Sequence, residues 1–499
     1  MLKEQKGTGI INNMKKLSII LAILILVSTL FASCANDTKP SGNKSNGTNE
    51  QSTDTGDGKY YGFDPLPALE DANGYVFKAY TRGRESGYVD WYTMDFTADG
   101  DENEIINESV YRRNGILSEK YGITLESVVS PKNQRELAEA SINAGDQSFD
   151  MIIAEGKSVA AMAQGGYCVD LKTLPYLQLD GPWWDQHANE QLSIGGKLFC
   201  TTGDLSMSDN DATWICVYNK NVWEENNIEN LYQLVRDNKW TIEKVEEISK
   251  QMKKDVNDDG KMDINDSYGY VFEPFNTYAL FYSLGESVTK KNADDYPELS
   301  VYSSSSAEVY DIIMDMVKSR DTYYIGWSRD CTSVVKDDRA LLASSTLWTI
   351  RNLYTSFDQD FGLLPMPKRY ADQPYVEVVD ASTCASLYAI PTSNVNTDVT
   401  AYALEALCRE SKDTLRKAYY DTAIEHKTMR DVESGEMLDI ILANRCFDLS
   451  MIYNWGGWYD MFCSMWTSSS SNFSSEYDTR KDQSINAIQG TIDEYIKNN

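Results

Sequence analysis

The chain has 499 residues and a formal net charge of −30, with 46 Lys and Arg against 76 Asp and Glu. This length allows two or more domains, and the negative charge disfavours binding to nucleic acid or to anionic membrane surfaces. Its two His, His187 and His426, lie far apart in the sequence. Neither a zinc site nor a His-based catalytic triad is therefore expected.

Residues 1–33 have the features of a secretory signal peptide. Lys15 and Lys16 precede an apolar run, Leu17–Phe31, which ends in small residues. This run is short for a membrane-spanning helix. Because the basic region is complete without residues 1–13, Met1 and Met14 are both candidate starts.

Cys34 directly follows this signal, and Phe31-Ala32-Ser33-Cys34 resembles a bacterial lipobox, although Phe31 stands where Leu is usual. The resemblance implies that Cys34 becomes a lipidated N-terminus, which holds the protein at the extracellular face of the cell membrane by its lipid anchor alone. A plain secretory signal with an incidental Cys is the alternative. Residues 34–58 are mostly small and polar and predict a disordered linker.

Strands and helices then alternate. A strand at Tyr75–Tyr80, a helix with apolar residues between positions 105 and 117, and a strand at Ile123–Val129 predict a parallel βαβ unit. A further helix, Pro131–Ala144, and strand, Phe149–Ala154, follow. The first of the eight Cys after Cys34 comes soon afterwards, and the sequence does not decide whether these eight form disulfides or are buried thiols.

Charged side chains follow two of these strands. In open α/β sheets, ligands bind beyond the carboxyl ends of the strands, which makes Arg82, Arg84 and Glu155 candidate binding residues. The alternative is that they are exposed loop charges. Trp183 and Trp184 could likewise stack on a sugar or fix their loop to the core.

Residues 193–219 predict a hinge between two lobes. Two short apolar strands, Lys197–Thr201 and Thr213–Tyr218, enclose a polar and flexible run, Gly203–Asp211, and Asn219 is a candidate cap for the next helix. An ordinary hairpin within one domain is the alternative.

Residues 255–266 predict a calcium-binding loop that follows a helix capped by Thr241 and precedes a strand. Oxygen-bearing side chains stand at positions 1, 3, 5, 9 and 12, Gly260 occupies the sharp turn, and position 7 would contribute its backbone carbonyl. The final Asp resembles a dockerin repeat more than a sensor EF-hand. We expect one structural Ca²⁺, and the alternative is a solvated acidic loop without metal. The expected ligands are Asp255, Asn257, Asp259, Lys261, Asp263 and Asp266.

Several segments, in order from about Tyr75 to the C-terminus, resemble the family 1 extracellular solute-binding proteins, the sugar-capturing subunits of ABC importers. They are Gly195-Gly196-Lys197, Tyr218-Asn219-Lys220, the "FDMII…GGYCVDL" segment at 149–171, the "VVKDDRALLASST" segment at 334–346 and the "DFGLLPMP" segment at 360–367.

The resemblance implies an α/β, two-lobed periplasmic-binding-protein-like fold with a hinge and multiple crossings between the lobes. We expect lobe 1 to comprise residues 59–206 and 362–398, and lobe 2 residues 207–361 and 399–499. It also implies a monomer that is not an enzyme, binds a carbohydrate, most simply an oligosaccharide, between its lobes and delivers it to ABC transporter permease subunits.

Aromatic rings are the expected sugar contacts. Phe275 lies in a Glu-Pro-aromatic turn that resembles one in maltodextrin-binding relatives, and Trp348 follows the 334–346 segment. Trp455 and Trp458 flank a Gly-Gly pair that would let backbone approach a ligand. Asp380, with Arg82 and Glu155, would bind the sugar hydroxyls. For each ring, packing in the core is the alternative.

Two other functions stay open. The abundant carboxylates are compatible with a secreted carbohydrate-active enzyme, although no motif specifies an acid/base pair. The calcium-like loop and the linker, taken alone, are compatible with a calcium-stabilised surface adhesin.

Overall fold

The computed structural model describes residues 59–84, 91–98, 100, 104–130, 134–425, 432–467 and 472–498. The predicted signal peptide, Cys34 and the linker to residue 58 lie outside these ranges. The chain divides into one unit at Met1–Thr53 and a second at Asp54–Asn499, which contains every element described below. Within the described ranges, no helix has both the length and the apolarity needed to cross a membrane.

The first of two main sheets has four strands in the order β12-β3-β1-β2. β1 (Val76–Arg82) runs parallel to β2 (Thr124–Ser130) and β3 (Met151–Glu155), and β12 (Ser386–Ala389) pairs antiparallel with β3. The predicted βαβ unit is confirmed, because α2 (Ile105–Tyr121) connects β1 and β2. This helix ends at Gly122, whose left-handed φ of 71° suits a residue without Cβ.

The second main sheet has five strands in the order β10-β4-β9-β5-β8. β5 (Tyr268–Phe272) lies between β8 (Tyr323–Ile325) and β9 (Ala340–Thr346) and is parallel to both. β4 (Trp214–Asn219) and β10 (Phe361–Leu364) complete the sheet in antiparallel pairings. Each main sheet thus combines parallel strands with antiparallel ones at one edge, which is typical of mixed α/β folds.

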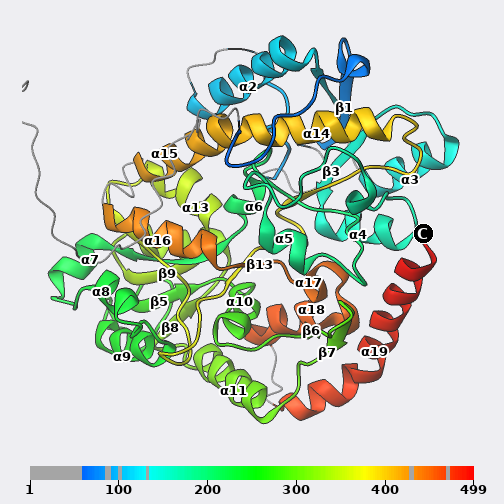
Figure 1. The fold of residues 1–499 in the computed structure, drawn as a ribbon. Coiled ribbons are helices and arrows are strands. Elements are labelled where there is room, and N and C mark those ends of the chain that lie inside the picture. The colour runs from blue at the N-terminus through cyan, green and yellow to red at the C-terminus, as the bar shows by residue number, and fades with distance from the viewer. Residues whose placement is uncertain are drawn as a thin grey trace, which may run out of the picture. The chain divides into compact units, whose positions relative to one another are not determined.

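Helices and two small sheets surround these main sheets (Figure 1). The small sheets pair β6 (Thr289–Lys291) with β7 (Pro297–Leu299) and β11 (Glu377–Val378) with β13 (Arg445–Cys446). The other helices are α3 (Gln134–Ala144), α4 (Gly156–Gln164), α5 (Gln186–Gln191), α6 (Ser208–Asp211), α7 (Lys220–Glu225), α8 (Leu231–Arg236), α9 (Ile242–Met252), α10 (Asn276–Ser283), α11 (Ser304–Lys318), α12 (Ser328–Lys336), α13 (Leu347–Asn352), α14 (Thr397–Ser411), α15 (Lys417–Glu425), α16 (Val432–Ala443), α17 (Leu449–Tyr453), α18 (Trp458–Ser464) and α19 (Phe473–Lys497).

The polar run Gly203–Asp211, expected to be flexible within the predicted hinge, is largely buried. The second strand predicted for the hinge forms as β4, but Lys197–Thr201 makes only isolated bridges, and residues 201–207 are all buried. Within this stretch Leu205 packs into a hydrophobic core and Ser206 donates a hydrogen bond to Asp95 at 2.8 Å. The chain therefore passes between the two sheets as packed structure, because Leu205 and Ser206 are both held by residues of the first half of the chain.

Two segments differ from the expected lobe boundaries. Residues 362–364 belong to β10 in the second sheet, because this strand pairs with β4, although residues 362–398 were expected in the first lobe. Helix α14 packs against α2 beside the first sheet, although it was expected to continue the second lobe after residue 398. Strand pairing and helix packing decide both assignments, and the other boundaries stay predictions.

The Trp183-Trp184 pair fixes its loop to the core, which is the alternative that the sequence left open. Trp183 is 0% exposed and lies under the Arg409 guanidinium, 4.2 Å from ring centroid to Cζ. The indole Nε1 of Trp184 donates a hydrogen bond to the buried carboxylate of Glu405 at 2.9 Å. Neither ring is available to a ligand.

The last helix, α19, packs on the cores of both sheets (Figure 1, red). Near its start, Phe473 stacks on Tyr310 of α11 with ring centroids 4.7 Å apart. Near its end, Tyr495 packs edge-on against Phe199 at 4.7 Å. This single helix thus links the two halves of the described body.

Candidate functional site

Residues from the carboxyl ends of both main sheets meet at one place. Trp91 follows β1 of the first sheet, and Trp348 follows β9 of the second. Their rings lie 6.0 Å apart between centroids, at an interplanar angle of 36°, and both side chains are half-buried. Because strand ends are where open α/β sheets bind ligands, this meeting point is the candidate site.

The Arg82 side chain, at the end of β1, is hydrogen-bonded to the backbone of the loop that contains Thr383 and Cys384. It is 1% exposed, and its guanidinium donates hydrogen bonds to the carbonyls of Thr383 and Cys384 at 2.9 and 2.8 Å. Glu155, at the end of β3, lies 3.9 Å from Arg82 Nε and accepts a hydrogen bond from Ser158 at 2.7 Å. Arg82 was expected to bind sugar hydroxyls, but its guanidinium instead positions the loop that contains Asp380, while Glu155 lies beside it.

Asp380 connects this loop to the second sheet. It is 4% exposed and accepts hydrogen bonds from the Thr383 backbone and the Tyr459 hydroxyl, each at 3.3 Å. Burial raises the pKa of the Asp380 carboxyl above its usual range. Tyr459 in turn stacks on Phe275, which follows β5, with centroids 6.5 Å apart and planes within 15°.

Phe275 and Tyr459 belong to a longer row of rings, which we call the aromatic row: Trp466, Trp327, Phe275 and Tyr459. Trp327 lies 5.6 Å from Trp466 and 5.7 Å from Phe275, and it is 51% exposed. An indole this exposed at the end of β8 leaves apolar ring surface open to a ligand. The sequence prediction named only Phe275 of these four rings.

The carboxyl group of Glu273, beside the aromatic row, is buried and hydrogen-bonded. It accepts bonds from the hydroxyls of Ser328 and Ser345, and burial raises its pKa above the usual range. Together with Asp380 and Glu155, it adds a third carboxyl group to the ends of these strands. The site thus combines flat apolar rings with acidic hydrogen-bond acceptors.

Two of the predicted ligand contacts are wrong. Trp455 and Trp458 are 2% and 0% exposed, and their indole N–H groups donate to Thr491 and Ser484 of α19 at 3.0 and 2.9 Å. Gly456, the first of the two glycines between them, serves helix packing, because a Cβ on it would lie 2.0 Å from Ser484 Oγ. Both indoles belong to the core under α19 and cannot stack on a ligand.

Sequence reasoning also missed Trp91 and Tyr459. Tyr459 directly follows Trp458, and the one-residue step along α18 turns its ring toward Asp380 and away from α19. Trp91 lies beyond the polar loop that was expected to supply Arg84. Arg84 instead donates to the hydroxyl of Tyr92 at 2.6 Å. In the sequence, the adjacent Trp91 and Tyr92 follow the polar loop at the end of β1, and this pair of rings was the signal that could have identified Trp91.

The calcium-like loop lies between α9 and β5, as predicted, and has the turns that such a loop requires. Asp258 and Gly260 adopt left-handed φ values of 56° and 78°. Asp255 Oδ2 accepts the Gly260 N–H at 2.8 Å, while Oδ1 of the same carboxylate is buried without a hydrogen-bond partner. That orphaned oxygen fits a cation, because a buried anionic acceptor needs a positive partner.

At the other end of the loop, the carboxylates accept hydrogen bonds from the backbone N–H groups of the loop itself. Asp266 is 0% exposed, and its two carboxylate oxygens accept the N–H groups of Val256 and Asp263 at 2.9 and 2.7 Å. The carboxylate of Asp263 accepts the N–H of Asn265 at 2.8 Å. Among the residues that the structure describes, no three His, Cys, Asp or Glu side chains converge as a metal site. The structural support for a bound ion therefore comes from the first half of the loop, where Asp255 Oδ1 has no hydrogen-bond partner.

Comparison with known proteins identifies the fold. No protein-family model and no curated protein matches this sequence. Among solved structures, a cyclo/maltodextrin-binding protein in complex with maltotetraose has a TM-score of 0.54 at 14% identity, covering 85% of this chain and 97% of its own.

Two further structures have the same fold. The ABC substrate-binding protein Lmo0181 of Listeria monocytogenes, in complex with cycloalternan, has a TM-score of 0.52 at 13% identity and covers 85% of this chain and 99% of its own. The GacH receptor of Streptomyces glaucescens GLA.O, solved unliganded and with acarbose, has a TM-score of 0.51 at 12% identity, with 85% and 98% coverage. This chain therefore has the two-lobed α/β fold of the periplasmic sugar-binding proteins.

Proposed function

We propose that this protein is an extracellular solute-binding protein that captures a carbohydrate, most simply an oligosaccharide, and delivers it to an ABC transporter permease. The observation that carries the proposal is the contact of Trp91, after a strand of the first sheet, with Trp348, after a strand of the second, and the aromatic row at the ends of β5 and β8 supports it. The three structures of the same fold are complexes with maltotetraose, cycloalternan and acarbose, which supports a carbohydrate as the ligand class.

The chemistry of the site suits a sugar. A pyranose ring has apolar C–H faces that stack on aromatic side chains, and its rim of hydroxyls donates hydrogen bonds to carboxylates. Trp91 and Trp348 follow strands of different sheets and contact each other, so a ligand bound beside this pair would contact both lobes. Closure of two lobes around a bound ligand is a familiar transition of this architecture.

A glycan panel tests this function. Because half-buried Trp91 and Trp348 lie at the site, binding should change the intrinsic Trp fluorescence, and calorimetry should then give a saturable 1:1 isotherm for at least one oligosaccharide. Chromatography of the glycan after incubation serves as the control for turnover. Cleavage of the glycan would contradict the transport function in favour of an enzyme, and no response to any glycan would contradict the ligand class.

We propose that Cys34 is the lipidated residue that holds the protein at the outer face of the cell membrane. The support is the order of basic residues, apolar run and small residues before it. Replacing Cys34 by Ala should release the protein from the membrane fraction into the medium, because Cys34 would carry all the acyl chains of the anchor. Retention of the Cys34→Ala variant on membranes, with normal processing, would contradict this assignment.

We also propose that residues 255–266 bind one structural Ca²⁺, with Asp255, Asn257, Asp259, Asp263 and Asp266 as side-chain ligands and Lys261 as a carbonyl ligand. An ion that binds only the native state at a hundredfold excess over its Kd should add about 2.7 kcal/mol to the free energy of unfolding.

Thermal unfolding with and without a chelator measures this stabilisation. Asp255→Ala should abolish the calcium response, because it removes the orphaned oxygen. Asp258→Asn, at an exposed position without a ligand role, is the matched control and should preserve the response. An unchanged melting temperature, together with no calcium by elemental analysis, would contradict the site.

A further inference from the structure

A cavity of about 510 Å³ lies where the hydrophobic cores of the two main sheets meet. Part of its wall is formed by Phe447 and Leu449, which belong to the core of the first sheet. Another part is formed by Tyr282, in the core of the second sheet, and by Tyr375, which packs against that core. Ligand pockets have volumes of this order and occur preferentially where domains meet, so this cavity is a candidate binding site.

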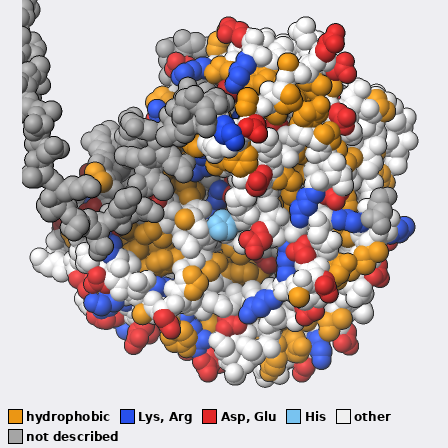
Figure 2. All heavy atoms as spheres, viewed as in Figure 1, with side chains coloured by type: hydrophobic (Ala, Val, Ile, Leu, Met, Phe, Trp, Pro, Cys, Tyr) orange, Lys and Arg blue, Asp and Glu red, His pale blue; other side chains and the backbone are white. Residues whose placement is uncertain are grey.

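The cavity is separate from the candidate carbohydrate site and reaches the surface. Neither the Trp91–Trp348 pair nor any ring of the aromatic row contributes to its wall. Glu190 and Pro374 of the wall are exposed. Figure 2 shows this face of the molecule hollowed next to the side chain of His187, which also lines the cavity.

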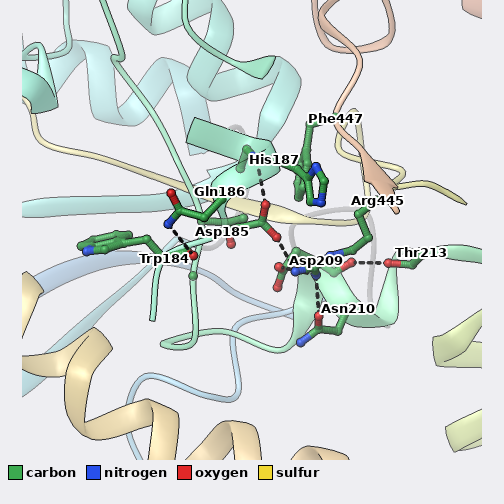
Figure 3. A network of polar contacts seen from close by, with 12 residues as sticks. Trp184, Asp185, Gln186, His187, Asp209, Asn210, Thr213, Arg445 and Phe447 are labelled. Atoms are coloured by element: carbon green, nitrogen blue, oxygen red, sulfur yellow. Dashed lines mark hydrogen bonds and ion pairs between the residues drawn. The ribbon is translucent and has the colours of Figure 1, made fainter. Parts of the chain in front are cut away.

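Two buried donors in the cavity wall have no hydrogen-bond partner, namely Ser287 Oγ and Arg445 Nε. The other two nitrogens of the Arg445 guanidinium donate to Asp209 and Asp185 (Figure 3). The backbone carbonyl of Ser287 accepts the Ser300 hydroxyl at 3.3 Å, but the Ser287 hydroxyl has no such contact. Because a buried donor without an acceptor is costly, both groups point to a molecule that supplies acceptors.

The two cations of the cavity wall already have carboxylate partners. Arg445 forms ion pairs with Asp185 and Asp209, the latter at 2.9 Å. Lys291 forms an ion pair with Asp295 at 2.8 Å. An anionic ligand would therefore have to compete with carboxylates that the protein itself provides.

The acidic residues of the wall do not require a cation either. Glu286 accepts hydrogen bonds from two serine hydroxyls, and Asp448 accepts one from the Tyr278 hydroxyl. Glu190 is exposed to water. A cation that only donates hydrogen bonds would also leave both unused donors of the wall without partners. An uncharged ligand that carries acceptors meets both conditions.

We propose that this cavity binds an uncharged, mainly apolar molecule whose carbonyl group accepts hydrogen bonds from Ser287 and Arg445. The side chains of Tyr282, Tyr375 and Leu449 would surround its apolar part. A carbonyl oxygen has two lone pairs and no proton to donate, which matches two donors without partners. The site does not rest on the proposed carbohydrate function.

Calorimetry with acetanilide, which joins a phenyl ring to an uncharged amide, tests the proposal. The expected result is a saturable isotherm. Benzoate and benzylammonium, which carry a negative and a positive charge on the same ring, should bind at least about tenfold more weakly. If acetanilide does not bind, or if either charged compound binds as tightly, the proposal is wrong.

Two variants of the cavity wall locate the binding signal. Ser287→Ala removes one donor and should weaken acetanilide binding at least about threefold, whereas Ser300→Ala, outside the wall, should leave affinity within about twofold. Thr289→Trp places a large side chain in the cavity and should abolish binding. Its control is Lys290→Trp, at the next position of β6, which is exposed and not part of the wall.

The outcome of these variants is decisive in either direction. Unchanged affinity in both Ser287→Ala and Thr289→Trp would place acetanilide elsewhere and overturn the proposal. Should Thr289→Trp unfold, Ser287→Ala still decides, because it removes only a hydroxyl that has no partner in the protein. Far-UV circular dichroism is the folding check.

Discussion

Replacing Trp348 by Ala is expected to weaken carbohydrate binding about thirtyfold or more. The indole of Trp348 follows β9, lies half-buried against Trp91 of the other sheet, and contributes one side of the candidate site. Truncating a buried aromatic residue at a binding hot spot typically costs about 2 kcal/mol or more, which corresponds to this loss in affinity. Titration calorimetry with the glycan selected from the panel measures it.

Trp223 is the matched control for this experiment. It is also an indole on the second sheet's side of the molecule, but it packs on Tyr218 and donates to the Glu229 carbonyl, away from the strand ends that form the site. Trp223→Ala should therefore leave affinity unchanged within about twofold. Equal affinities of wild type and Trp348→Ala would exclude Trp348 from the site. Retained calcium stabilisation in Trp348→Ala would show that the variant is folded.

Trp458→Ala is expected to lower the free energy of unfolding by about 3–5 kcal/mol without a direct effect on the ligand site. The Trp458 indole is 0% exposed, packs edge-on against Phe473 at 6.1 Å and donates to Ser484 of α19. Removing it leaves a cavity under the helix that links both sheets. Urea unfolding followed by circular dichroism gives the change in stability.

A conservative variant separates the two contributions of Trp458. Trp458→Phe keeps an aromatic ring but loses the indole N–H, and the hydroxyl of Ser484 still donates to the Arg480 carbonyl at 2.8 Å. Its destabilisation should therefore be smaller than that of Trp458→Ala. If Trp458→Ala instead has wild-type stability and the affinity loss expected of Trp348→Ala, the side chain belongs to the ligand site and its assignment to the core is wrong.

The sequence by itself determined the elements with strong local signals. The apolar positions of α2 and the Gly that ends it, the β-branched strands on either side, and the Thr241 cap of α9 depend on residues within a few positions of each other. The order of strand, helix and strand then predicted the parallel pairing of β1 with β2. The Asp255–Gly260 turn likewise follows from the glycine and acidic residues within the loop.

The tertiary structure alone decided which side chains face the site. Trp458 and Tyr459 are adjacent aromatic residues with the same local pattern, but α19, from the end of the chain, covers the first and leaves the second to contact Asp380. The polar run of the predicted hinge is buried, and within it Ser206 donates a hydrogen bond to Asp95, more than a hundred residues earlier. Local periodicity specifies helices and strands, whereas exposure depends on contacts between residues far apart in the sequence, which no single segment encodes.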